Sequence, residues 1–217
     1  MTLLHGYWRS SAAYRLRIAL NLKGLDYEQV SVNLKDGHQR DAAHKARHPQ
    51  GFVPVLDIDD LQLIQSPAIL EYLEETHPEP ALLPGNPADR ARIRAYAAVI
   101  GCDIHPVQNL RLLQYIRTEY GQDAGAVTAW VQRWISDGFS ALQAMAEVDG
   151  FGGPYLCGET PTMADIYLVP QAYNARRFGV KVEDYPRLSV ADKAARALPA
   201  FAAAAPENQP DAPEDGH

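Results

Sequence analysis

The first third of the chain alternates between short apolar runs and one longer apolar stretch with helical spacing. Residues 3–8 form an apolar run that predicts a strand. A helix is expected to begin at Ser10-Ser11; its apolar residues Leu16, Ile18, Ala19, Leu20 and Leu22 predict that it is mostly buried, and Gly24 stops it at the C′ position. Residues 27–33 alternate apolar and polar side chains, as a strand does. A β-α-β unit of this length predicts parallel strands joined by a right-handed crossover.

Residues 34–83 add two helices and a hairpin to this unit. Residues 39–47 predict a short helix, and apolar runs at 55–58 and 61–64 predict a hairpin. Serine at the N-cap with proline as the first helical residue predicts a helix that begins at Ser66-Pro67. The resulting order, β-α-β-α-β-β-α, is a thioredoxin-like arrangement.

The composition changes after a segment rich in proline. Residues 77–87 contain four prolines and one glycine, which is typical of a linker, and the pattern is helical almost throughout from residue 88 to about residue 200. The sequence therefore predicts an α/β, thioredoxin-like domain over 1–83, a linker at 84–87 and an all-helical domain over 88–217. The tail, rich in alanine, proline and acidic residues, is expected to be disordered from about residue 207.

Two features mark helix boundaries in the second domain. His105-Pro106 interrupts the long helical stretch 88–120, and a kink is expected there. Thr162 and Asp165 have the spacing of a capping box before an apolar run, with Asp in place of the usual Glu or Gln. We interpret this second motif as structural.

Composition and charge exclude several classes of function. The chain has 217 residues and a formal net charge of −7, without a Lys/Arg run, which argues against a nucleic-acid surface. Its two cysteines, Cys102 and Cys157, lack spaced partners, so neither a disulfide framework nor a zinc site is expected. No apolar run approaches the ~20 residues that a membrane span needs. We therefore expect a cytoplasmic protein that does not enter a membrane.

Histidines cluster between the second and third predicted strands. His38, His44 and His48 could be read as metal ligands, but they lack tight pairing and no carboxylate or thiol completes a set. A solvated face is the favoured interpretation, and no metal is expected.

The serines at the start of the first helix are candidates for chemistry. The first N–H groups of a helix have no intrahelical partner, and the helix dipole favours negative charge there. A hydroxyl of Ser10 or Ser11 could donate to a thiolate and lower its pKa. Helix caps of this kind are common, so this stretch alone favours a purely structural interpretation.

Two further positions extend this candidate site. Val53 precedes Pro54 and is held extended, which leaves its backbone able to pair with a peptide ligand. Gln65-Ser66 begins another helix and offers a seat for a carboxylate, although a plain cap explains it equally well. Without a Cys-x-x-Cys motif, a dithiol redox protein is excluded. A thiol, a peptide backbone and a terminal carboxylate together describe glutathione.

The chain resembles a known family over nearly its whole length. It is similar to the zeta-class glutathione transferases, the maleylacetoacetate isomerase family, in which maleylpyruvate isomerases share most of the same motifs. The stretches that carry this resemblance are 9–11, 15–20, 50–54 and 65–69 in the first domain, and 101–109 and 169–178 in the second.

The resemblance implies roles for individual residues, with glutathione as the cofactor. Ser11, helped by Ser10, would hold the thiolate, and Val53 with a cis Pro54 would bind the cysteinyl part. Gln65 and Ser66 would bind the γ-glutamyl end, and Gln50 and His38 the glycyl end. The second domain would add Asp103, His105, Gln108 and Asn109 to the glutathione-binding residues. Arg9 and Arg177 would bind the carboxylates of a dicarboxylate diketo-acid substrate, with Arg176 or Arg111 as further candidates. Ser10, Ser11, Arg9 and Arg177 would form the catalytic group, and a homodimer is expected.

One position departs from the family pattern. The family commonly has cysteine after the two serines, whereas this chain has Ala12. Because the expected reaction uses the sulfur of glutathione, the protein need not supply a thiol.

Three functions remain open at this stage. The first is cis–trans isomerisation of maleylacetoacetate or maleylpyruvate in aromatic catabolism, by addition of the glutathione thiolate, bond rotation and elimination. The second is a broader transferase that conjugates or dehalogenates small electrophiles and consumes glutathione. The third is a non-catalytic binding module, which predicts loss of Ser11 and of Gln65-Ser66, residues that this sequence retains.

Overall fold

A four-stranded sheet of order β2-β1-β3-β4 organises the first part of the computed structural model, which describes residues 1–213. The strands are β1 (Leu3–Gly6), β2 (Glu28–Ser31), β3 (Val55–Ile58) and β4 (Leu61–Ile64). β2 runs parallel to β1, whereas β3 is antiparallel to β1 and forms a hairpin with β4. The predicted parallel β-α-β unit and the predicted hairpin are therefore confirmed.

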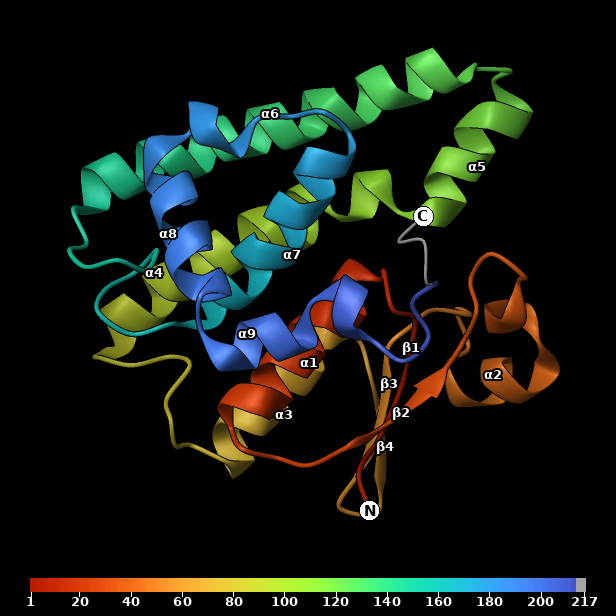
Figure 1. Cartoon of the computed structure of the whole chain (residues 1–217), viewed down its shortest axis with the longest axis horizontal. Coiled ribbons are helices and arrows are strands. Elements are labelled where there is room, and N and C mark those ends of the chain that lie inside the picture. Colours follow the sequence, from red (N-terminus) through yellow and green to blue (C-terminus); the bar gives the residue numbers. More distant parts are fainter. Residues whose placement is uncertain (214–217) are drawn as a thin grey trace. The chain divides into compact units, whose positions relative to one another are not determined.

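Helices lie on both sides of this sheet. α1 (Ser11–Leu22), α3 (Ser66–Thr76) and α9 (Pro199–Ala204) lie together on one side, and α2 (Ala42–Arg47) lies on the other (Figure 1). α1 packs against both α3 and α9. The expected thioredoxin-like arrangement is present, with α9 as an additional helix from the end of the chain.

The end of the chain differs from the expectation. Residues 197–213 group with residues 1–82 as one unit, and residues 83–196 form a second unit. Residues 207–213 are ordered: a 3-10 helix spans Pro206–Asn208, and Asp211 accepts a hydrogen bond from the Trp8 backbone. The reason is that Phe201, Ala204 and Pro206 are buried, which gives this alanine-rich segment an apolar face. The rest of the expected disordered tail, residues 214–217, lies outside the described residues.

The second unit is helical, as predicted. Its α-helices are α4 (Pro87–Ala98), α5 (Leu110–Glu119), α6 (Ala124–Asp149), α7 (Met163–Arg177) and α8 (Pro186–Arg196). Between α4 and α5 the chain forms a π-helical turn, Val99–Ile104, and a 3-10 turn, Pro106–Gln108. The predicted interruption at His105-Pro106 is therefore confirmed.

The π-helical turn is packed closely from two sides. A Cβ at Gly101 would meet Cε1 of Tyr167 on α7 at 2.8 Å, and a Cβ at Gly138 on α6 would overlap the side chain of Ile104. Both glycines thus allow the turn to approach its neighbours. This packing fixes the start of the segment that carries His105 and Gln108.

α7 is buried along most of its length. The predicted capping box is present: the Asp165 carboxylate accepts from the Thr162 N–H at 2.8 Å and from the Leu156 N–H at 2.8 Å. Burial raises the pKa of Asp165, and the hydrogen bonds from Leu156 and Thr162 act against that rise. A helix buried on all sides is typical of the centre of a bundle, so polar residues on α7 require partners within the protein.

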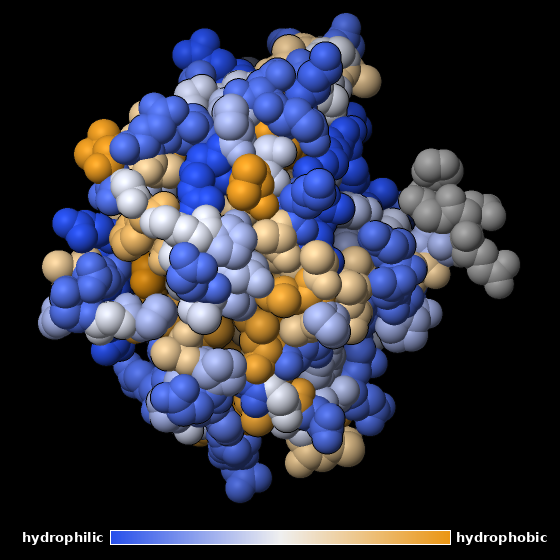
Figure 2. Space-filling model, turned by 60° about the vertical axis from the view of Figure 1, so that its left-hand side comes forward, coloured by the Kyte–Doolittle hydropathy of each residue, from blue (hydrophilic) through white to orange (hydrophobic). Residues whose placement is uncertain are grey.

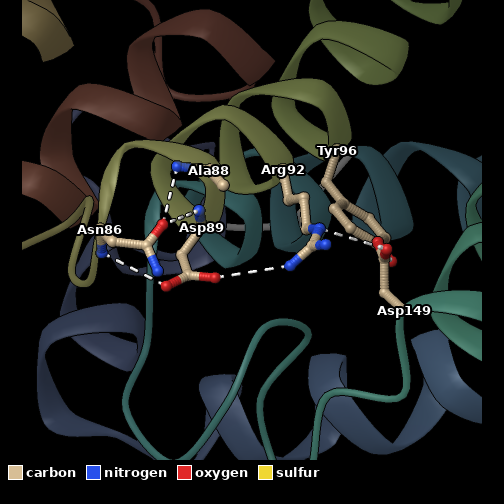
Figure 3. A network of polar contacts seen from close by, with 6 residues as sticks. All are labelled: Asn86, Ala88, Asp89, Arg92, Tyr96 and Asp149. Carbon is tan, nitrogen blue, oxygen red and sulfur yellow. Dashed lines mark hydrogen bonds and ion pairs between the residues drawn. The ribbon is translucent and has the colours of Figure 1, made fainter.

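A polar network that includes a second capping box connects α4 with the end of α6 (Figure 3). The Asn86 side chain accepts from the Ala88 and Asp89 amides at 2.8 and 3.1 Å, and Asp89 accepts from the Asn86 amide at 3.2 Å. Arg92 reaches both Asp89 and Asp149, and Tyr96 donates to Asp149 at 2.8 Å. Burial first, and then this hydrogen bond, raise the pKa of Tyr96 above its ordinary value.

The surface mixes polar and apolar residues. Figure 2 shows one face on which hydrophobic residues gather near the centre and hydrophilic residues surround them. Among the described residues, none of the helices combines the length and the apolar character that crossing a membrane requires.

Candidate functional site

The two serines at the start of α1 have different roles. Ser10 is the N-cap, and its Oγ accepts from the Ala13 amide at 3.2 Å. Ser11 is the first helical residue, and within residues 1–213 its half-buried hydroxyl makes no hydrogen bond. The N–H groups at the start of a helix lack intrahelical acceptors, so the Ser11 hydroxyl and these amides can bind an anion together.

Arg9 lies directly before this helix start. Its guanidinium carbon lies 5.1 Å from the centre of the Trp8 ring, within the range of a cation–π contact. The Trp8 ring is 3% exposed and therefore offers a rigid support. Arg9 is thus held beside Ser10 and Ser11.

A buried cation connects α1 with the start of α3. Nη1 of Arg15 donates to Oγ of Ser66 at 3.4 Å, and Arg15 is 1% exposed. Ser66 is the first residue of α3 and Gln65 occupies the N-cap position, so the expectation that Ser66 is the N-cap is wrong. The Ser66 hydroxyl faces a guanidinium instead of capping its own helix.

Gln65 has an unusual backbone conformation. Its φ is 69°, a region that residues other than glycine seldom adopt, and its Nε2 donates to Oε1 of Gln50 at 2.6 Å. Such outliers often occur where a side chain or backbone group is held for binding. The structure therefore brings together two of the predicted glutathione residues, Gln50 and Gln65.

The segment before β3 presents an unpaired backbone. The Val53–Pro54 bond is cis, as the family resemblance implied, and within the described residues neither backbone polar group of Val53 makes a hydrogen bond. The preceding carbonyl, that of Phe52, is 2.7 Å from Nε2 of His44. Val53 can therefore pair with a peptide that lies alongside it, as in an added strand.

Two of the three histidines are buried, contrary to the expected solvated face. His44 is 6% exposed and His48 is 1% exposed, whereas His38 is exposed. The His48 ring lies 5.6 Å from the Phe52 ring. Burial, and then the neighbouring His44, lower the pKa of His48. These histidines support the segment that carries Val53. Among the described residues, no group of His, Cys, Asp and Glu could hold a metal ion.

In the second unit, three amide side chains form a hydrogen-bonded chain that ends at Arg177. Nη1 of Arg177 donates to Asn174 at 3.1 Å, Asn174 donates to Gln108 at 2.8 Å, and Gln108 donates to Gln171 at 2.8 Å. The three amide residues are buried, whereas Arg177 is exposed. Because hydrogen bonds in such a chain polarise one another, the buried amides hold the Arg177 guanidinium in one direction.

The other predicted residues of the second unit lie near the start of α5. Asn109 is its N-cap, and Oδ1 accepts from the Leu112 amide at 3.2 Å. His105 is half-buried, and Asp103 and Arg111 are exposed. The Asn109 and Gln108 amides thus have structural partners within the chain, which favours a positioning role for both.

Arg176 differs from its neighbour Arg177. Its Nη2 lies 2.6 Å from Oδ2 of Asp192, a residue that is fully buried on α8. Arg196 reaches the same oxygen at 3.0 Å. Arg176 therefore holds α7 against α8, and Arg177 is the better candidate for binding a substrate.

Sequence reasoning did not find several supporting residues. His44 contacts the Phe52 carbonyl beside Val53, and Arg15 contacts Ser66. Gln171 contacts Gln108, and Asn174 contacts Arg177. The sequence carries a signal for α7, where Gln171, Asn174 and Arg177 recur every three residues after the largely apolar run 166–170.

Comparisons with known proteins place both units in one family. Residues 1–75 match the family described as "Glutathione S-transferase, N-terminal domain", and residues 128–190 match "Glutathione S-transferase, C-terminal domain". The chain is 52% identical over 209 residues to a maleylpyruvate isomerase from a Ralstonia species, which covers 96% of this chain and 98% of the relative.

Solved structures agree with this similarity. The holo structure of a maleylpyruvate isomerase, described as a bacterial zeta-class glutathione S-transferase, has a TM-score of 0.94 at 51% identity, covering 96% of this chain and 99% of that one. A maleylacetoacetate isomerase from Anaeromyxobacter dehalogenans with bound glutathione has a TM-score of 0.87 at 46% identity, covering 98% of both chains. The chain therefore belongs to the zeta-class glutathione transferases, the family of the maleylpyruvate and maleylacetoacetate isomerases.

Proposed function

We propose that this protein is a glutathione-dependent cis–trans isomerase of maleylacetoacetate or maleylpyruvate, in the breakdown of aromatic compounds. The observation that carries the proposal is the start of α1, where the Ser11 hydroxyl is unpaired among the described residues and Ser10 is already used as the cap. Within residues 1–213 the Ser11 hydroxyl thus has both its donor and its acceptor positions open to a ligand, whereas one acceptor position of Ser10 is used by the Ala13 amide. One solved structure described as zeta class and another with bound glutathione, both named as isomerases, support the same activity.

The residues of the first unit fit glutathione. The Val53 backbone has unpaired groups for the cysteinyl part of the peptide, within the described chain. Gln65 and Ser66, at the start of α3, are proposed to bind the γ-glutamyl carboxylate, with the buried Arg15 adding positive charge there. Gln50 and His38 are proposed at the glycyl end. In the second unit, His105 and Asp103 remain proposed contacts, while Gln108 and Asn109 are proposed to act by positioning.

Arginines are proposed to bind the substrate. Arg9, supported by Trp8, and Arg177, supported by Asn174, would each bind one carboxylate of the dianion. Arg111 is an additional candidate because it is exposed near the start of α5. Arg176 is the weakest candidate because its guanidinium contacts Asp192.

The chemistry needs little from the protein beyond charge and position. Bound glutathione supplies the thiolate whose reversible addition to the cis double bond allows rotation about that bond. Ser11 donates to the sulfur and favours its charged form, because a hydrogen bond to an anion lowers its pKa. Arg9 and Arg177 hold the substrate carboxylates, and positive charge beside the substrate stabilises the negative charge that develops on its carbonyl oxygen.

Ala12 is compatible with this proposal. It is 8% exposed and lies within α1, so its side chain faces the interior of the unit. The sulfur that reacts belongs to glutathione, so a cysteine at this position is not required for the addition step.

We also propose a cytoplasmic homodimer. Family membership supports dimerisation, and the unpaired cysteines Cys102 and Cys157 fit a reducing compartment. Sedimentation or light scattering of the purified chain tests the dimer directly, and a mass of about 24 kDa would contradict it.

The activity is tested by assaying maleylacetoacetate and maleylpyruvate in parallel, with and without glutathione, while the glutathione concentration is followed. Isomerisation that needs glutathione but leaves its concentration unchanged is expected. The ratio of the two kcat/KM values then identifies the preferred substrate. Consumption of glutathione with halogenated acids, without isomerisation of either substrate, would instead establish a conjugating transferase.

A further inference from the structure

The peptide groups of Trp8 are held from both sides by charged side chains. Nη2 of Arg17 donates to the Trp8 carbonyl oxygen at 2.9 Å, and the Trp8 N–H donates to Oδ2 of Asp211 at 3.0 Å. Trp8 lies in the turn between β1 and α1, directly before Arg9 and Ser10. Both backbone polar groups of one residue are thus fixed beside the candidate thiolate site.

Arg17 links this turn to the end of the chain. It is 0% exposed, and its Nε donates to the Ala204 carbonyl oxygen on α9 at 2.9 Å. Burial lowers its pKa to about 10, and nearby Tyr27, Tyr14 and Asp211 act against that fall. A buried guanidinium needs such acceptors, because an unpaired buried charge is costly.

Asp211 joins the same turn to strand β2. Its Oδ1 accepts from Nε2 of Gln29 at 2.7 Å, and its Oδ2 accepts from the Ser31 hydroxyl at 3.0 Å in addition to the Trp8 N–H. Gln29 and Ser31 both belong to β2. A residue more than 200 positions away in the sequence therefore completes the polar contacts of the β1–α1 turn.

We propose that residues 197–213 form a strap that positions the catalytic turn, with Asp211 as its main positioning residue. Asp211 does not touch glutathione or substrate in this proposal; it acts through Trp8. The proposal rests on the proposed function, because it gives that turn the tasks of holding a thiolate at Ser11 and a carboxylate at Arg9.

The effect of the strap on each task follows from the contacts. Arg9 is supported by the Trp8 ring, so a shift of Trp8 moves the substrate anchor. The Ser10 N–H donates to the Tyr7 carbonyl oxygen at 2.9 Å, so the same turn sets where α1 begins. Displacements of ~1 Å in a positioning element can lower rates by up to ~100-fold.

The test compares Asp211→Ala, Asp211→Asn and Glu207→Gln with the unaltered full-length chain. Glu207 is an exposed acidic residue of the same strap and serves as the matched control. Three quantities are measured on the folded protein: the pKa of the bound glutathione thiol, from the ultraviolet absorbance of the thiolate, and kcat and KM for the dianionic substrate.

We expect Asp211→Ala to raise the pKa of the bound thiol and to lower kcat/KM about tenfold. Asp211→Asn keeps an oxygen acceptor for the Trp8 N–H and should recover most of that loss, and Glu207→Gln should stay within about twofold of the unaltered protein. A lower melting temperature of Asp211→Ala with unchanged thiol pKa, KM and kcat would overturn the proposal and leave the strap a purely structural element.

The two proposals fail in distinguishable ways. The thiol titration requires only that glutathione binds, so it reports on the turn even if neither maleyl substrate is isomerised. If no isomerisation is seen but Asp211→Ala changes the thiol pKa, the proposed activity alone is contradicted. If the protein isomerises substrate and Asp211→Ala changes neither the thiol pKa nor KM, the positioning role of the strap alone is contradicted.

Discussion

Arg177 donates a hydrogen bond to the side-chain oxygen of Asn174, three residues earlier on α7, at 3.1 Å. Arg177 is exposed, whereas Asn174 is buried, so a buried amide orients a cation at the surface. Gln108 and Gln171 continue the same chain into the interior. The direction of Arg177 is therefore set by residues that would not contact the substrate.

Removal of this support should weaken substrate binding. We expect Asn174→Ala to raise KM for the dianionic substrate about tenfold, because a hydrogen bond to a charged group contributes ~1.5–3 kcal/mol. The thiol pKa of bound glutathione should not change. Steady-state kinetics and the thiolate absorbance measure the two effects. Gln143→Ala, which also removes a hydrogen bond in this unit, is the control; an equal rise in KM there would contradict the interpretation.

Substitutions of Arg176 and Arg177 should have different effects, one on stability and the other on activity. Arg177→Ala should lower kcat/KM at least tenfold, from the loss of a charged hydrogen bond to the substrate, with little change in stability. Arg176→Ala should leave kcat/KM nearly unchanged and lower the free energy of unfolding by ~2 kcal/mol, because the buried Asp192 would lose the nearer of these two arginines. Urea unfolding and steady-state kinetics of both variants test this prediction. Loss of activity in Arg176→Ala and loss of stability in Arg177→Ala would exchange the two roles.

Substitutions of Ser10 and Ser11 should also have different effects. Ser10→Ala removes the cap at Ala13 and should cost ~1 kcal/mol of stability. Ser11→Ala should instead raise the pKa of the bound glutathione thiol and lower kcat about 100-fold, as the loss of one donor to a developing anion does elsewhere. The thiolate titration is the decisive measurement. If Ser10→Ala raised the thiol pKa more than Ser11→Ala did, the assignment of the serines would have to be exchanged.

Removal of one partner from a buried ion pair should strongly destabilise the first unit. Nζ of Lys23 lies 2.7 Å from Oε2 of Glu74, and the same oxygen accepts from the Leu82 amide at 2.9 Å. Glu74→Gln should lower the free energy of unfolding by ~3 kcal/mol, because it leaves the fully buried ammonium without its counter-charge. Asp137→Asn breaks the exposed pair with Arg133 and should change it by less than ~0.5 kcal/mol. Similar losses in both variants would contradict this prediction.

Stability should decrease as the pH falls through 6.5 because of His48. Burial lowers its pKa in the folded state below the ordinary 6.5, so the unfolded chain binds the proton first. Its contribution is fully present above pH 6.5 and is lost as the pH falls towards the folded-state pKa. Urea midpoints at pH 7.5 and 5.5 should differ less for His48→Gln than for the unaltered protein. His77→Gln, a histidine at the end of α3, is the control and should retain the full difference.

The regular elements of both units were predictable because their signals are local. Short apolar runs and one alternating stretch located the strands of the sheet, and Gly24 and Pro67 marked a helix end and a helix start. Gly24 has a φ of 66° just after α1, and the Leu25 amide bonds back to the Leu20 carbonyl, as a Schellman motif requires. Patterns of this kind need no knowledge of distant partners.

The strap could not be predicted because its partners lie at the other end of the sequence. Its composition of alanine, proline and acidic residues is typical of disorder, yet Phe201 and Ala204 are buried in the same unit as α1. In the same way Arg17 looks like a solvent-facing residue until the carbonyls of Trp8 and Ala204 are known.

For the candidate site, motifs located the residues but not their division of labour. The pair Ser10-Ser11, the Val53–Pro54 bond and Gln65 were found from the sequence. That Ser10 caps, that Ser66 faces Arg15, and that Arg176 pairs with Asp192 depend on side-chain directions. Local sequence does not encode those directions, since they depend on packing between distant segments.

The contact between α1 and α9 has a consequence for how the protein is made. Domains commonly fold in order as the ribosome releases them, with the N-terminal one first. Here Arg17 on α1 donates to the Ala204 carbonyl, which lies 187 residues later in the sequence, beyond the whole of the second unit. The first unit therefore lacks this acceptor for its cation until the residues of the second unit have been synthesised.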